Sequence, residues 1–218
     1  MYPPTRLPGS GLLVSLPLAL AVIACGGGDD GEVTTTRSVL AHDTTFLVAG
    51  VESSATLHAE LRRAGRVQEA DVAVAVTSGD LAAHVDGAAL VVDGLTVTFG
   101  DIALPLEIFP SDLTLTGIGV HLAAPLVLPA YWTDDDEAAT SSGPGRLRLD
   151  WSLRIDGQVY PLGEQELGDL GFELAVHRDG PRLRFDLAVL AHGVMWSWAD
   201  IIALGDLELE VTAYALLE

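Results

Sequence analysis

The chain has 218 residues, with 31 acidic side chains against 11 basic ones and a single cysteine. A formal net charge of −20 argues against a nucleic-acid partner, because binding phosphates requires clustered cations. One cysteine excludes an internal disulfide framework and any cysteine-rich zinc site. With 49% hydrophobic residues, the chain can bury the core of one domain or of two small ones.

The first 24 residues have the pattern of an export signal. Arg6 is their only basic side chain, and an apolar run of thirteen residues follows from Leu12 to Ala24. A helix that spans a bilayer needs about 20 apolar residues. We therefore expect residues 1–24 to be a secretory signal peptide rather than a permanent membrane span.

The only cysteine comes directly after this run, in Val22-Ile23-Ala24-Cys25. The tetrapeptide resembles the lipobox of bacterial lipoproteins, and the resemblance covers only the first 25 residues. It implies that Cys25 carries lipid such as palmitate, becomes the first mature residue and attaches the protein to a membrane of the cell envelope. The alternative is ordinary cleavage near Ala21 or Ala24, which would leave Cys25 as a thiol without a partner in the chain.

Residues 25–36 are rich in Gly, Asp and Thr and predict a flexible tether. In enterobacterial lipoproteins an Asp after the lipidated cysteine favours the inner membrane, whereas Gly26 stands at that position here. The resemblance therefore favours the outer membrane over the inner one. Removal of residues 1–24 takes away Arg6 and no acid, so the mature charge is 10 − 31, or −21.

Residues 37–218 predict an all-β, antiparallel domain, with at most one or two short helical turns. Apolar and polar side chains alternate with a period of two, as in strands that have one face in a core and the other in water. We expect a single β-sandwich; the alternative is two β halves, 37–130 and 146–218. The clearest alternating segments are 71–77, 101–109, 146–155, 182–190 and 207–216.

Turn signals separate these segments. Asp93-Gly94 and Asp156-Gly157 predict two-residue hairpin turns, and Arg178–Pro181 predicts a third turn. The segment Ser54–Arg63 fits a helix almost as well as a strand, and we prefer a strand because its neighbours are strands. Trp198–Leu204 predicts a short helical turn, with Ser197 as its N-cap and a glycine after its end.

The longest polar interruption, residues 132–145, predicts a surface loop. It contains the acidic run Asp134-Asp135-Asp136-Glu137, whose carboxylates are ligands that calcium prefers. The run lacks the alternate spacing and central glycine of an EF-hand loop, so a solvated charged loop is the competing interpretation. Calcium at these four residues is the one cofactor that the sequence suggests.

Catalytic and transition-metal signatures are missing from the sequence. The six histidines are scattered singly, so any metal site would have to be assembled by the fold. The chain contains no GxSxG elbow, no SxxK motif and no phosphate-binding glycine loop. A catalytic triad built from distant positions would leave no such signature. We predict a protein that is not an enzyme, with a hydrolase as the remaining alternative.

Aromatic residues offer the best candidate binding surface. Tyr131 and Trp132 border the predicted acidic loop and are expected to be partly exposed. Trp151, Trp196 and Trp198 lie in apolar strand patterns and are expected in the core.

The sequence is compatible with two functions. The first is a lipid-anchored envelope protein whose β domain is structural or binds another protein or surface component. The second is a carrier of an apolar ligand such as lipid, because segments 118–129 and 101–109 are apolar on both faces.

Overall fold

The computed structural model describes residues 34–104 and 113–217. The predicted signal peptide, the lipobox with Cys25 and most of the tether lie outside the described residues, as do positions 105–109 of one predicted strand. The described chain contains one short helix and thirteen strands: α1 (Thr36–Val39), β1 (Thr44–Val48), β2 (Ser54–Arg63), β3 (Arg66–Val74), β4 (Val76–Asp86), β5 (Ala89–Phe99), β6 (Ile102–Ala103), β7 (Leu113–Leu122), β8 (Leu126–Pro129), β9 (Tyr131–Trp132), β10 (Ala138–Ile155), β11 (Gln158–Asp179), β12 (Arg182–Trp198) and β13 (Ile201–Leu216).

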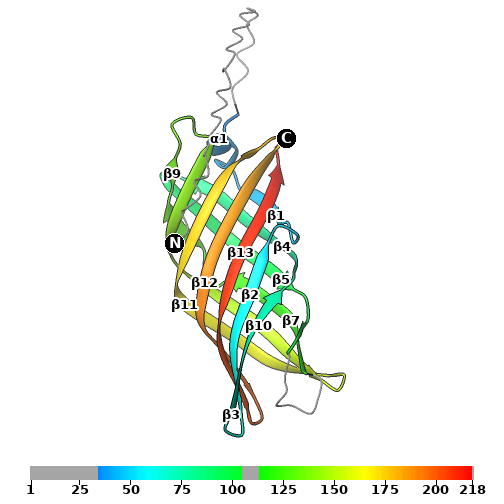
Figure 1. Cartoon of the computed structure of the whole chain (residues 1–218). Helices are drawn as coiled ribbons and strands as arrows, with labels where there is room; N and C mark the ends of the chain where they lie inside the picture. Colours follow the sequence, from blue (N-terminus) through cyan, green and yellow to red (C-terminus); the bar gives the residue numbers. More distant parts are fainter. Residues whose placement is uncertain (1–33, 105–112, 218) are drawn as a thin grey trace, which may run out of the picture. The chain divides into compact units, whose positions relative to one another are not determined.

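All thirteen strands belong to one antiparallel sheet that closes on itself. Its path runs β1-β4-β5-β7-β10-β11-β12-β13, and β1 then pairs with β13 through Leu47 opposite Tyr214 and Val48 opposite Ala213. The first ten residues of β13 pair with β2, which carries β3 on its other side (Figure 1). The all-β antiparallel prediction is confirmed, but the β-sandwich was wrong in detail: the sheet is a closed, barrel-like ring.

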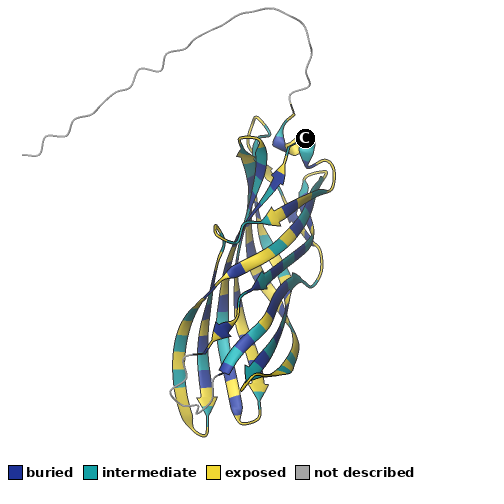
Figure 2. Ribbon diagram, turned by 90° about the vertical axis from the view of Figure 1, so that its right-hand side faces the viewer, coloured by how far each residue is buried: buried dark blue, intermediate teal, exposed yellow. Residues whose placement is uncertain are grey.

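Buried and exposed residues alternate along many of the strands (Figure 2). On β10, Leu147, Leu149 and Leu153 are fully buried, while Arg146 and Arg148 on the opposite face are exposed. The buried side chains form one continuous cluster. Outward positions of the described strands carry many charged side chains, together with exposed apolar ones such as Val127, Met195 and Ile202.

The predicted loop 132–145 was wrong in its extent. Only residues 133–137 connect β9 to β10, because β10 already begins at Ala138 and pairs with β11 from its first residue. Gly143 and Gly145 occupy inward positions where a Cβ atom would meet Leu128 or Leu126, and Phe172 also reaches Gly145. Small residues make room for large neighbours, so this part of β10 has no apolar periodicity in its own sequence.

Of four local expectations, two are confirmed and two are wrong. Asp156-Gly157 is confirmed as the β10–β11 turn, with both residues at positive φ, and Ser54–Arg63 is confirmed as a strand. Asp93-Gly94 is not a turn, because β5 runs through it without a break. The helical turn at Trp198–Leu204 is also wrong, since Trp198 pairs directly with Ile201 across a tight hairpin.

The helix α1 starts inside the segment predicted as tether. Thr36 is buried, and the side chain of Thr35 caps the helix by accepting a hydrogen bond from the amide of Ser38. The folded unit thus begins at least two residues before the predicted boundary. Among the described residues, no helix has the length and apolar character needed to cross a membrane.

Candidate functional site

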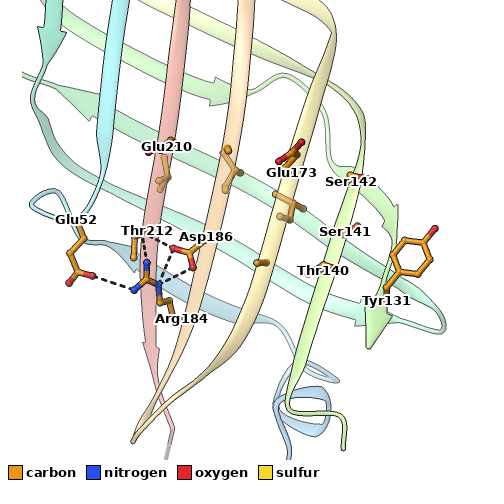
Figure 3. Close-up of a pocket in the computed structure, with 15 residues that line it drawn as sticks. Glu52, Tyr131, Thr140, Ser141, Ser142, Glu173, Arg184, Asp186, Glu210 and Thr212 are labelled. Carbon is orange, nitrogen blue, oxygen red and sulfur yellow. Dashed lines mark hydrogen bonds and ion pairs between the residues drawn. The ribbon is translucent and has the colours of Figure 1, made fainter. Parts of the chain in front are cut away.

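A groove of about 600 Å³ lies on the outer face of β10–β13 (Figure 3). Short outward side chains form its floor, namely Thr140, Ser142, Ala175 and Ala188, so the surface is lower there than around it. Tyr131 of β9 stands at one side and Glu52, in the loop between β1 and β2, at the other (Figure 3).

Strand register arranges the floor in two rows. One row runs across four strands as Ser142, Glu173, Ala188 and Glu210. Two carboxylates therefore flank an alanine, and because neighbouring strands are spaced by about 4.8 Å, they start from backbones about 10 Å apart. The space between them suits a cationic side chain lying over Ala188.

The second row contains an arginine held in place by carboxylates. It runs Thr140, Ala175, Asp186 and Thr212, with Arg184 two positions before Asp186 on β12. The Nε of Arg184 donates to both Asp186 oxygens, at 3.0 and 2.9 Å, and the Thr212 hydroxyl donates to Asp186 at 2.7 Å.

Glu52 completes this cluster from the loop between β1 and β2. Its carboxylate lies 3.9 Å from Arg184 and accepts a hydrogen bond of 2.6 Å from Tyr214. Ser53 fixes the loop, because the amide of Thr212 donates to its hydroxyl at 3.0 Å.

The hydrogen bond to Asp186 raises the pKa of Arg184 above its ordinary value, and the hydrogen bond to Glu52 raises that of Tyr214. Arg184 is therefore a fixed cation and Tyr214 stays protonated at neutral pH. The four carboxylates of the groove, Glu52, Glu173, Asp186 and Glu210, outweigh this one cation by three charges.

The two aromatic residues of the predicted binding surface, Tyr131 and Trp132, point to opposite faces of β9. Tyr131 is 65% exposed and lines the groove, opposite Thr140 of β10. Trp132 points the other way, packs against the core and lies beneath the Arg37 guanidinium, 5.6 Å from the ring centroid. Of the predicted core tryptophans, Trp151 and Trp196 are buried, and Trp198 is half-buried against Tyr160.

The acidic loop makes contacts within the protein. Asp135 accepts a hydrogen bond from Thr133 at 2.6 Å, which lowers the pKa of its carboxyl. Asp136 pairs with Arg37 at 3.2 Å, and Glu137 lies 3.7 Å from Arg178. Three of the four predicted calcium ligands thus hold the loop to α1, β11 or its own backbone. Calcium binding at Asp134–Glu137 stays a prediction.

The described part of the interior contains a small apolar cavity. A cavity of about 20 Å³ lies among apolar side chains that include Phe99, Leu115, Trp151 and Leu207. Pockets for small molecules typically have volumes of about 300 to 1,000 Å³. This cavity is far smaller, and the described residues of the two segments that suggested a lipid carrier, such as Leu104, Ile118 and Val120, belong to the buried core.

Sequence reasoning found Tyr131 but missed the rest of the groove. Glu173, Arg184, Asp186 and Glu210 alternate with buried residues on three separate strands, so each looks like an ordinary outward side chain. Only the register of β10–β13 brings them together.

No family model and no curated protein matches the chain. Among solved structures, the chain is similar to two crystal structures of Ail, the attachment invasion locus protein of Yersinia pestis. The first has 8% identity and a TM-score of 0.34, and covers 79% of this chain and 98% of Ail. The second, in complex with the heparin analogue sucrose octasulfate, has 7% identity and a TM-score of 0.37, and covers 80% and 99%. These values are too low to carry an argument about function.

Proposed function

We propose that this protein is a non-enzymatic lipoprotein of the cell envelope whose groove binds a basic segment of another envelope protein. Cys25 carries the lipid, and the outer membrane is the favoured location. The observation that carries the proposal is the groove on β10–β13, a concave surface with an excess of three negative charges and an exposed tyrosine at its side.

The geometry of the groove supports a peptide-like partner with cationic side chains. Glu173 and Glu210 flank Ala188, so a lysine or arginine can lie on the alanine with carboxylates on both sides. Arg184 is already neutralised by Asp186 and Glu52, so it does not repel a cation strongly. Tyrosine adds contact area at low cost in conformational entropy, which is why it is frequent at binding surfaces.

The membrane attachment rests on the sequence Val22-Ile23-Ala24-Cys25 and on the charged outer face of the ring. Eight residues lie between Cys25 and Thr34, the first described residue. A folded unit with a charged surface suits a protein held near a membrane by lipid and otherwise surrounded by water.

A charge-matched pair of variants tests the groove. The probe is a fluorescent hexalysine peptide, titrated against the purified full chain at low salt and followed by anisotropy. We expect Glu173→Gln combined with Glu210→Gln to weaken binding roughly tenfold, because both carboxylates contact the bound cation. The control, Glu69→Gln combined with Asp156→Asn, removes the same charge outside the groove and is expected to change affinity less than about twofold.

Equal loss in both double variants would mean that the peptide senses only the overall charge, and the groove proposal would fail. A separate experiment tests the attachment: the Cys25→Ala variant is expected to leave the membrane fraction of a bacterial host and to incorporate no labelled palmitate. A wild-type chain without the label, together with a variant that stays on membranes, would overturn the lipoprotein assignment.

A further inference from the structure

A second cluster of ionisable side chains lies away from the groove, where three separate segments meet. Asp43 belongs to the link between α1 and β1, His84 to β4 and Asp93 to β5. The Nδ1 atom of His84 lies 2.8 Å from an Asp93 oxygen and 3.5 Å from an Asp43 oxygen. All three potential ligand atoms lie within 4.8 Å of one another.

A β-bulge turns Asp93 toward the histidine. Ala82 pairs with Gly94 and Ala83 with Val92, so Asp93 is an extra residue without a partner on β4. Bulges of this kind redirect a side chain and are frequent beside functional sites. Asp93-Gly94, predicted as a hairpin turn, thus lies at a bulge within a continuous strand.

The donor set has the chemistry of a divalent transition-metal site. An imidazole nitrogen with two carboxylate oxygens suits zinc and similar ions, whereas calcium takes oxygen ligands alone. At zinc–ligand distances of about 2.0 to 2.2 Å, tetrahedral ligands lie about 3.4 Å apart. The two separations from Nδ1, 2.8 and 3.5 Å, lie on either side of this value, so small side-chain rotations suffice.

The electrostatics of the cluster also favour a cation. Two carboxylates converge on one histidine, and within residues 34–104 and 113–217 neither forms an ion pair with an arginine. A proton on Nδ1 can serve only one of the two carboxylates with a short hydrogen bond. A divalent ion in its place would contact both.

We propose that Asp43, His84 and Asp93 bind one divalent transition-metal ion, with zinc as its representative. The three protein ligands leave a fourth position to water, as in open zinc sites. Because Asp43 lies in the link that follows α1, the bound ion would also fasten this link to β4 and β5.

The test is calorimetric titration of the purified full chain, without a histidine tag, with zinc chloride. We expect one tight site, and we expect its affinity to fall at least about tenfold in His84→Gln and in Asp43→Ala. Asp43 is 91% exposed, so its variant leaves the fold intact even if changes in β4 do not. His121→Gln is the control, because among the described residues His121 pairs with a single carboxylate, Asp150 at 2.9 Å.

The outcomes separate this site from general binding to an acidic surface. X-ray absorption of the zinc-loaded chain is expected to show nitrogen and oxygen ligands without sulfur, with the nitrogen signal lost in His84→Gln. Zinc affinity that is unchanged in both site variants, or no zinc binding by the wild type, would overturn the proposal. Neither result depends on the peptide groove, which lies on other strands.

Discussion

At the residue scale, the side-chain alternation of the long strands was readable from the sequence. Leu183, Phe185 and Leu187 of β12 are buried as expected, and the charged positions between them face outward. Inward positions occupied by small residues were not readable, because Ser141, Gly143 and Gly145 have no hydrophobic signature. Their role depends on side chains from neighbouring strands that fill the same space.

Gly145 gives a prediction at this scale. A Cβ atom there would meet Leu126 and come within 2.7 Å of the Phe172 ring, so Gly145→Ala is expected to lower the free energy of unfolding by about 1 to 3 kcal/mol. Gly171→Ala is the matched control on β11, where an added Cβ has no neighbour within 4 Å. Denaturant unfolding measures both variants, and equal losses would contradict the close packing described here.

His58 gives a second residue-scale prediction. Its hydrogen bond to Asp71, at 2.8 Å, raises the pKa of the imidazole, and Glu208 and Asp206 act in the same direction. The folded state therefore favours protonated His58; this stabilisation is full below the ordinary pKa of about 6.5 and is lost as pH rises through the raised value. Asp71→Asn should lower the pKa measured by NMR titration of the ring protons. An unchanged pKa would show that the hydrogen bond is not its cause.

At the element scale, turn predictions held where the local residues alone determine the turn, and failed where contacts with another strand decide the structure. Asp156-Gly157 works as a two-residue turn because both residues adopt positive φ between paired strands. The signals around Trp198–Leu204 misled, since Gly205 is not a helix stop. It lies within β13, where a Cβ atom would collide with the backbone carbonyl of His58 on β2. That close approach belongs to strand pairing and leaves no trace in local sequence.

The β12–β13 turn carries the element-scale prediction. Ala199 has a φ of 50°, in the left-handed region that costs an L-residue roughly 1 kcal/mol. Ala199→Gly is therefore expected to raise the free energy of unfolding by up to about 1 kcal/mol. The control, Ala188→Gly within β12, is expected to lower it by about 0.5 to 1 kcal/mol. Thermal unfolding of both variants checks the sign, and a loss in Ala199→Gly would contradict the turn geometry.

At the scale of the whole molecule, closure of the sheet could not be predicted from the sequence. A sandwich and a closed ring share the same inward and outward alternation, so the pattern that identified the strands does not distinguish them. The deciding contact is short: β1 meets β13 through two residue pairs, and Phe46 packs against Phe185 with ring centroids 5.3 Å apart. The groove depends on the same long-range register, so the sequence did not predict it either.

Ring closure predicts the effect of truncating Phe46. This side chain is fully buried, so Phe46→Ala is expected to lower the free energy of unfolding by about 3 to 5 kcal/mol. The amides at the β1–β13 junction should also lose protection in hydrogen exchange before those of β10 and β11. Leu47→Ala, at an exposed neighbouring position, is expected to stay within about 0.5 kcal/mol of the wild type. Uniform loss of protection would argue against a local closing contact.

The central claim is that the outer face of β10–β13 is a binding surface for cationic segments. The most direct test is an NMR titration of the isotope-labelled full chain with the hexalysine peptide. We predict the largest amide shifts at Glu173, Ala188 and Glu210, with smaller changes near Tyr131. Shifts concentrated on the acidic loop at Asp134–Glu137, or spread evenly over the charged outer face, would contradict the claim.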